Sequence, residues 1–330
     1  MAEIVKEMLS VVVPAYNEEA VLPEFHRRLA RLFDLLPAYD CEVVYVNDGS
    51  SDGTQLIVER LAAADERVSS VNLSRNFGKE IAMTAGLDHA RGDAIVVIDA
   101  DLQDPPELIP ELLKEWKSGY DVVYATRTVR EGETWFKKAT AAWFYRLIQQ
   151  VSRVKIPADT GDFRLMSRRA VNALLALREQ HRFMKGLFAW VGFPSKAVAY
   201  QRDPRFAGET KFNYWKLWNF ALEGITSFTI APLKVATYVG LGTSLFAFSY
   251  GAWIIFKTLV YGDIVRGYPT IMVTILFLGG VQLFFIGVIG EYVGRIFNET
   301  KARPLYFVQG YQPSRAARER TARERFNLQA

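Results

Sequence analysis

Short apolar runs alternate with segments of helical spacing along the first third of the chain. Between the runs, apolar residues recur every three or four positions, as on one face of a helix. Strands that are apolar throughout and separated by helices indicate an α/β fold, with parallel strands covered by helices. The predicted strands are 9–13, 42–46, 68–73, 94–98 and 121–125, and the predicted helices are 20–36, 52–64 and 79–90.

Two much longer apolar runs lie near the C-terminus. Residues 235–256 and 267–290 contain no charged side chain over 22 and 24 positions. A helix of either length spans a hydrocarbon layer of about 30 Å. One such run alone could be a buried helix of a soluble protein, but two together predict a pair of transmembrane helices.

The charge distribution predicts how these helices are oriented. No apolar leader precedes the first strand, so we expect the polar domain to stay in the cytoplasm. From residue 301 onward the chain has seven Lys or Arg and two Glu, a net charge of +5. This charge agrees with the positive-inside bias and predicts a cytoplasmic tail. Nucleic acid could bind such a tail, but anionic lipid is nearer, so no nucleic-acid partner is expected. The single cysteine, Cys41, excludes an internal disulfide.

Polar side chains follow three of the predicted strands. Ligands of open α/β sheets bind beyond the carboxyl ends of parallel strands, so these side chains predict a nucleotide-type site. It is not a dinucleotide site of the usual kind, because neither GxGxxG nor GxxxxGK[ST] occurs. The side chains are Asn17 and Glu18, Asn47 and Asp48, and Asp99 and Asp101.

One of these strand ends has the chemistry of a metal site. Asp99, Asp101 and Gln103 supply hard oxygen ligands suited to Mg²⁺ or Mn²⁺. A divalent ion held there would stabilise negative charge on a departing diphosphate. The alternative is a capped turn, since Asp before Pro105 and Pro106 is ordinary loop chemistry.

Several longer stretches resemble the family 2 glycosyltransferases, which have the GT-A fold. Within that family, residues 160–170, residues 205–212 and the two spans resemble the polyprenyl-phosphate glycosyltransferases. This group includes dolichyl-phosphate mannose synthase and bactoprenol glucosyltransferases of the GtrB type, and the GtrB type is the nearer match. The stretches are VVVPAYNEE (11–19), VNDGSSDGT (46–54), SRNFGKEIAMTAGLDHARGD (74–93) and DADLQDPPE (99–107).

The resemblance implies a donor site made by these motifs. Arg205 and Lys211 flank a glycine-containing loop that would close over the diphosphate. Arg127 is implied as a donor contact, although a lone arginine is more often a solvated surface residue. The other implied contacts are Pro14, Tyr16 and Glu18 around the nucleoside, Asp48 at the base, and the Ala100 backbone along the nucleoside.

The resemblance also implies the reaction: glucose moves from UDP-glucose to undecaprenyl phosphate with inversion. The acceptor is already an oxyanion, so alignment and metal stabilisation matter more than a strong base. Asp159 is the expected base in preference to Asp162, and Arg164 the expected acceptor-phosphate contact; either acid could instead cap a loop.

GDP-mannose and UDP-linked aminoarabinose derivatives remain alternative donors. A processive polysaccharide synthase is a rival, but residues 180–183 lack the Trp of QxxRW, and a non-enzymatic scaffold would not explain the strand-end acids.

The predicted organisation is a GT-A nucleotide-sugar-binding domain joined to a membrane part. Residues 135–151 and 214–228 predict amphipathic helices at the membrane surface, or else helices packed on the sheet. Residues 304–312 predict a β-hairpin turning at Gly310 that needs a sheet edge, either of its own subunit or, as the resemblance implies, of a neighbour in a homo-tetramer. The expected parts are the catalytic domain (1–210), a juxtamembrane helix (211–230), two spans (231–298) and a basic cytoplasmic tail (299–330).

Overall fold

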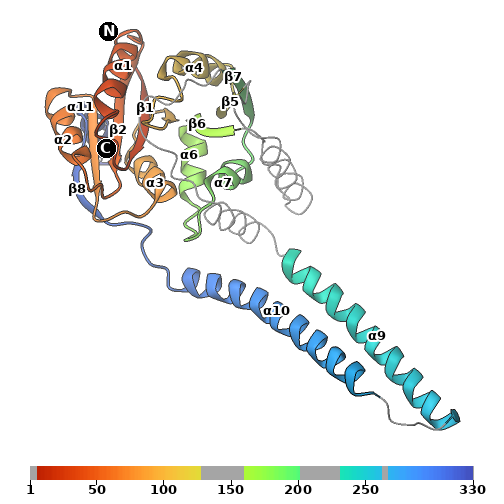
Figure 1. The fold of residues 1–330 in the computed structure, drawn as a ribbon. Coiled ribbons are helices and arrows are strands. Elements are labelled where there is room, and N and C mark those ends of the chain that lie inside the picture. The colour runs from red at the N-terminus through yellow and green to blue at the C-terminus, as the bar shows by residue number, and fades with distance from the viewer. Residues whose placement is uncertain (1–5, 128–159, 201–230, 262–266, 330) are drawn as a thin grey trace.

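The described residues of the catalytic part form one mixed β-sheet between two layers of helices. The structure is a computed structural model and describes residues 6–127, 160–200, 231–261 and 267–329 (Figure 1). In this part of the chain the sheet has eight strands in the order β7-β5-β6-β4-β1-β2-β3-β8. Their bounds are β1 Glu7–Ala15, β2 Tyr39–Asn47, β3 Val68–Leu73, β4 Ala94–Val97, β5 Val122–Arg127, β6 Thr160–Ser167, β7 Ser195–Tyr200 and β8 Val308–Gln312.

The centre of the sheet confirms the predicted α/β class. Strands β4, β1, β2 and β3 are parallel neighbours, and each overlaps a predicted strand, although β4 ends at Val97, one residue short of the prediction. The sheet is not parallel throughout, however, because β6 runs antiparallel to both β4 and β5. Strand β6 was not predicted, because its sequence TGDFRLMS carries two charges and lacks a continuous apolar run.

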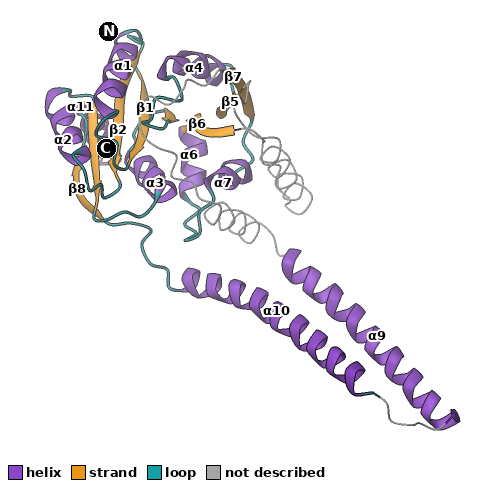
Figure 2. Ribbon diagram, viewed as in Figure 1, coloured by secondary structure: helices purple, strands orange, loops and turns teal. Residues whose placement is uncertain are grey.

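Alternate residues of the central strands face two separate cores. Val11 and Val13 of β1 face the core under α1, α2 and α4, whereas Val12 faces the core under α3, α6 and α7. Gly86 allows α3 to approach β1 closely, since a Cβ there would lie 2.3 Å from Cγ1 of Val12. The helices are α1 Leu22–Asp34, α2 Thr54–Ala64, α3 Lys79–His89, α4 Ile109–Lys117 (preceded by the 3₁₀ turn η1 Pro106–Leu108), α6 Arg168–Leu175 and α7 Met184–Trp190 (Figure 2).

The two long apolar segments form helices that extend away from the sheet. Helix α9 spans Ala231–Tyr261 and α10 spans Tyr268–Thr300 (Figure 1). Within them, Val235–Tyr261 and Val273–Thr300 are long and apolar enough to cross a membrane. Their apolar side chains are exposed rather than packed in a core, which is what membrane-spanning helices require and soluble core helices do not.

The end of α10 is tied to the catalytic part by hydrogen bonds. Glu299 Oε1 accepts from the Gln180 backbone N–H at 2.7 Å. Just beyond the helix, the Tyr306 hydroxyl donates to Asp88 Oδ2 at 2.7 Å. The catalytic part is therefore held close to the end of the second predicted span.

The tail does not form the predicted hairpin. It forms one strand, β8, and a helix, α11 (Arg315–Gln329). Gly310 lies inside β8 opposite Asn72 of β3 rather than in a turn, and β8 runs antiparallel to β3. Here the strand completes the sheet of its own chain, one of the two partners that the sequence left open.

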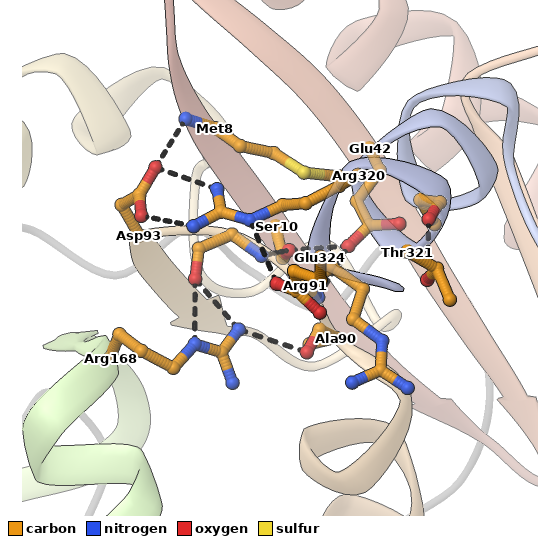
Figure 3. Close-up of polar contacts among 12 residues, drawn as sticks. Met8, Ser10, Glu42, Ala90, Arg91, Asp93, Arg168, Arg320, Thr321 and Glu324 are labelled. Carbon is orange, nitrogen blue, oxygen red and sulfur yellow. Dashed lines mark hydrogen bonds and ion pairs between the residues drawn. The ribbon is translucent and has the colours of Figure 1, made fainter. Parts of the chain in front are cut away.

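Helix α11 is fastened at the amino ends of the central strands. Ser314 donates to Glu42 Oε2 at 2.9 Å, and Glu42 is fully buried. Arg320 makes a two-pronged pair with Asp93 at 2.8 and 2.5 Å (Figure 3). Burial opposes ionisation of Asp93, but the bond from Arg320 and one from the Met8 backbone outweigh it and lower its pKa. Helix α11 is thus bound at the edge opposite to the carboxyl ends of the parallel strands.

We expect Arg320→Gln to loosen α11 from the sheet. The substitution removes a two-pronged, half-buried ion pair, which is worth about 1 kcal/mol, or roughly a fivefold increase in local opening. Hydrogen exchange of residues 315–329 measures this opening. The control is Arg318→Gln on the same helix, because Arg318 has no ion pair within the described residues; equal exchange in the two variants would contradict the assigned contact.

Candidate active site

The loops that follow β1 and β2 are joined to each other at the carboxyl edge of the sheet. Strand β1 lies between β2 and β4, so the three strand ends meet there as predicted. The Asn17 backbone N–H donates to Ser50 Oγ at 3.0 Å, and Asn17 Oδ1 accepts from the Ser51 N–H at 2.9 Å. The Glu18 N–H donates to Thr54 Oγ1 at 2.8 Å. These bonds form one continuous polar surface from two separate loops.

Three residues predicted to line the nucleoside pocket lie on or beside this surface. Pro14 is near the end of β1 and pairs with Val46 of β2. Tyr16 and Glu18 follow on the loop, and the Tyr16 side chain is 40% exposed. Asn17 between them has φ of 55°, so the chain turns sharply here. Their positions are compatible with the predicted pocket, and their nucleoside contacts stay predictions.

Asp48 organises the backbone at the start of α3. Its buried carboxylate accepts hydrogen bonds from the backbone N–H groups of Phe77 at 2.7 Å and Gly78 at 2.9 Å. Burial raises the pKa of Asp48, and these two bonds partly offset the rise. Gly78 has φ of +94°, which a residue with a side chain rarely adopts. Asp48 therefore fixes the position from which the next side chain, Lys79, extends; its predicted bond to the base stays a prediction.

Lys79 is a site residue that the sequence reasoning missed. Its ammonium lies 2.7 Å from Asp99 Oδ1 and 2.5 Å from Asp162 Oδ2. Partial removal from water opposes its charge, but the two carboxylates outweigh that effect and raise the pKa of Lys79. Lys79 belongs to one of the stretches that carry the family resemblance, and its place directly after a glycine at a predicted helix start was the only local signal.

Asp99, Ala100, Asp101 and Gln103 form a tight turn after β4. Asp101 Oδ1 accepts from the Gln103 N–H at 3.1 Å, so the capped-turn interpretation holds for this side chain. Ala100 is buried beneath the turn. Burial raises the pKa of Asp99, against the effect of Lys79. The turn thus carries two carboxylates and an amide within a short segment at the carboxyl end of β4.

This donor set fits a divalent ion shared with a substrate. Within the described residues, no three His, Cys, Asp or Glu side chains gather as a metal cluster. Mg²⁺ is commonly held by one or two carboxylates together with substrate phosphates, rather than by a cage made only of protein. Asp99 and Asp101 provide that number of carboxylates, with Gln103 as an amide oxygen beside them. The residues suit an ion that arrives with a diphosphate.

Strand β6 brings Asp162 and Arg164 to the same region. Asp162 lies within the strand rather than in a loop, and Lys79 and Lys185 outweigh its burial and lower its pKa to about 2. Arg164 is buried, donates to the Gly161 carbonyl at 2.9 Å and stacks 3.6 Å from the Phe188 ring. Burial lowers the pKa of Arg164 to about 10. In this arrangement Arg164 holds the backbone beside Asp162, and its predicted acceptor-phosphate contact stays a prediction.

Glu80 is a second carboxylate that the sequence reasoning missed. It follows Lys79 on α3, and one of its oxygens, Oε2, is buried without a hydrogen-bond partner in the described part of the chain. Burial and the nearby charge of Asp162 raise the pKa of Glu80 to about 8, against the opposing effects of Lys79 and Lys185. The surroundings of Glu80 thus favour its protonated form.

The other predicted site residues are not placed by the structure. Asp159, Arg205 and Lys211 lie outside the described residues, as do the two predicted amphipathic helices at 135–151 and 214–228. Arg127 ends β5 and pairs with Tyr200 of β7 through the backbone, but its side chain is not described. Their roles remain those implied by the resemblance.

Comparisons with known proteins agree over nearly the whole chain. Residues 10–175 match the model of glycosyl transferase family 2, and residues 231–296 match that of the GtrB C-terminal hairpin. The bactoprenol glucosyl transferase of Shigella phage SfX is 52% identical over 91% of this chain and 98% of its own. The prophage bactoprenol glucosyl transferase homolog of Escherichia coli is 51% identical over the same shares. The crystal structure of glucosyl-3-phosphoglycerate synthase from Mycobacterium tuberculosis is 21% identical, with a TM-score of 0.47 over 67% of this chain and 78% of that one.

We expect the stability of the Glu80→Gln variant to fall less than that of wild type between pH 5 and pH 8. The folded protein binds the Glu80 proton more tightly than the unfolded chain does, since its pKa rises from 4.5 to about 8. The stability that protonated Glu80 contributes at pH 5 is therefore lost as the pH rises toward 8. The neutral amide of the variant has no proton to release, so its contribution does not change with pH. The variant should be more stable than wild type by at least about 1 kcal/mol above pH 8, with little difference at pH 5.

Thermal unfolding followed across this pH range measures the effect. Glu111→Gln is a matched control, because Glu111 is an exposed residue of α4. Parallel pH profiles for Glu80→Gln and wild type would show that Glu80 does not carry the proton.

Proposed function

Because the chain belongs to glycosyltransferase family 2, we propose that it transfers glucose to the phosphate of a polyprenyl phosphate at a membrane. The observation that carries the proposal is the 52% identity to bactoprenol glucosyl transferases across both the catalytic part and the apolar helices. A catalytic domain tied to two apolar helices suits a reaction in which one substrate is water-soluble and the other stays in the bilayer. We propose UDP-glucose as the donor.

The proposed chemistry is a single displacement. An acceptor phosphate oxygen attacks the anomeric carbon of glucose as the bond from that carbon to the UDP diphosphate breaks, so the configuration inverts and UDP leaves. The acceptor is ionised at neutral pH, so alignment contributes most of the rate. Asp99, Asp101 and Gln103 would hold Mg²⁺ or Mn²⁺, which would neutralise charge developing on the leaving diphosphate. Arg127, Arg205 and Lys211 would contact the same diphosphate, and alanine substitutions there should raise KM for the donor.

The experiment that tests the function uses the full chain in membranes. It is supplied with undecaprenyl phosphate and, in separate reactions, labelled UDP-glucose, GDP-mannose or a UDP-linked aminoarabinose derivative. We expect chloroform-soluble label from UDP-glucose only, and only when the lipid is present. Lipid-linked label from another donor would change the sugar assignment. A long labelled polymer would favour a processive synthase, and no transfer from any donor would overturn the proposal.

Asp101→Asn should abolish transfer and leave the fold intact. Asp101 lies on an edge turn after β4 rather than in either core, while its carboxylate is a proposed ligand of the ion. We expect activity to fall by about 10³-fold or more, as for the loss of a group that stabilises the transition state. Initial rates at saturating Mn²⁺, beside a thermal unfolding curve, test this. Activity near that of wild type would remove Asp101 from the metal site.

Asp159→Asn should slow turnover much more than it weakens donor binding. We propose Asp159 as the base or orienting carboxylate for the acceptor phosphate, with Arg164 beside it, so its effect belongs in the transfer step. Turnover number and donor Kd, measured separately, distinguish the two effects. Asp162→Asn is the comparison, since Asp162 is the other carboxylate of the motif and is already paired with Lys79. A turnover number unchanged by Asp159→Asn would exclude this role.

The proposed location is the inner membrane, with the catalytic domain and the tail both in the cytoplasm. Two apolar helices return the chain to the side on which it began, and the tail is basic. Protease added to sealed inverted vesicles should cleave both parts. Protection of either part would overturn the orientation.

We also propose a homo-oligomer, in particular a tetramer joined through the tails. Strand β8 occupies an edge of the sheet, and the same hydrogen bonds to β3 can form between copies if the tail is exchanged. A chain ended after Arg303 lacks β8 and α11. Native mass measurement in detergent should show a loosened assembly for this truncated chain; a monomer at full length, or an unchanged assembly after truncation, would contradict the proposal.

A further inference from the structure

The ammonium of Lys79 is paired with the carboxylate of Asp99, which is a proposed ligand of the metal ion. It lies 2.7 Å from one carboxylate oxygen of Asp99 and 2.8 Å from the other. An ion bound to this carboxylate would approach the same two oxygens, so the ammonium and the ion cannot both hold them at full strength. The two cations would therefore compete for Asp99.

Lys79 is able to move away from Asp99 without leaving the site. Its side chain is 44% exposed and sits on a flexible four-carbon stem. Its second partner, Asp162, is 10% exposed and lies 2.5 Å from the ammonium. The other oxygen of Asp162, Oδ1, is buried with no hydrogen-bond partner within the described residues, so it can accept the ammonium when Asp99 is released.

The backbone beneath Lys79 is fixed while its side chain moves. Asp48 holds the N–H groups of Phe77 and Gly78, the two residues before Lys79. A displaced ammonium therefore swings about an anchored point and stays within reach of Asp162. This geometry favours a switch between two defined partners over a general loosening of the loop.

We propose that Lys79 is a placeholder cation, which pairs with Asp99 until a divalent ion arrives and then remains with Asp162. The inference rests on the proposed function, in which Asp99 is a ligand of that ion. Without the placeholder, Asp99 would lose its ion pair in the ion-free enzyme, and among the described residues Asp162 would keep only the charges of Lys185 and Arg164. With it, the site stays ordered before the donor brings its metal ion.

A static role for Lys79 makes the opposite prediction. If Lys79 only ties β4 to β6, its loss would leave Asp99 poorly oriented and would weaken metal binding. If Lys79 is a competitor, its loss would strengthen metal binding in the absence of nucleotide. The direction of the change in affinity separates the two roles.

The experiment measures Mn²⁺ binding to the full-length enzyme in detergent, without nucleotide, from the free-ion signal in electron paramagnetic resonance. Lys79→Met and Lys79→Gln both remove the charge, and the amide of the second keeps a hydrogen-bond donor if the first fails to fold. We expect about tenfold tighter binding in either variant, the size expected for removing one charged hydrogen-bond competitor. Mn²⁺ should also raise the melting temperature of these variants more than that of wild type.

Lys185→Met is the matched control. Lys185 lies on α7 and its charge acts on Asp162, but no ion pair joins it to Asp99 within the described residues. We expect its Mn²⁺ affinity to stay within about twofold of wild type. Equal or weaker binding by the Lys79 variants, with normal binding by wild type, would overturn the placeholder role alone. Absence of Mn²⁺ binding in every protein, with UDP added as well, would overturn the metal assignment together with it.

Discussion

The burial of negative charge at the ends of apolar strands is the constraint on which the rest of this structure depends. A carboxylate removed from water is stable only when cations or N–H groups replace its hydration. The fold meets this need at the carboxyl edge by bringing Lys79 from α3 between Asp99 and Asp162. Asp48 meets it with two backbone N–H groups. The same arrangement leaves a site whose charges are poised to exchange partners.

The opposite edge of the sheet uses similar chemistry for a different purpose. Glu42 is fully buried at the start of β2, where Ser10 and Ser314 hydroxyls and the Arg91 N–H donate to it. Nearby, Arg168 donates to the Ala90 carbonyl (Figure 3). Glu42 thus binds the returning tail through Ser314, at the opposite ends of the parallel strands from the candidate site. One edge thus carries the residues of the candidate site, and the other binds the tail.

Attachment of the tail matters because the two substrates occupy different phases. Hydrogen bonds near Glu299 and Tyr306 hold the catalytic part at the end of α10, and β8 and α11 then continue across the sheet. The catalytic part is thus held both at the end of α10 and at β8, a few residues further along the chain. These two attachments leave it little freedom to move away from the helices. This restraint is useful to an enzyme whose acceptor phosphate cannot leave the bilayer, since alignment contributes much of the rate.

Local patterns in the sequence determined the central strands, the first three helices and the two apolar helices. Strand and helix periods, and the length of an uncharged run, depend on near neighbours in the chain. The strand-end acids were also predictable, because parallel strands bring their carboxyl ends to one edge. Only the tertiary structure decided how those acids are compensated. Lys79 and Asp162 are 83 positions apart, and Ser314 and Glu42 are 272 apart. Strand β6 was missed because its partners are also distant in the sequence. Asp162 and Arg164 look like loop residues until their partners in α3 and α7 are known. The energy of a buried charge depends on what the fold places beside it, and no local pattern carries that information.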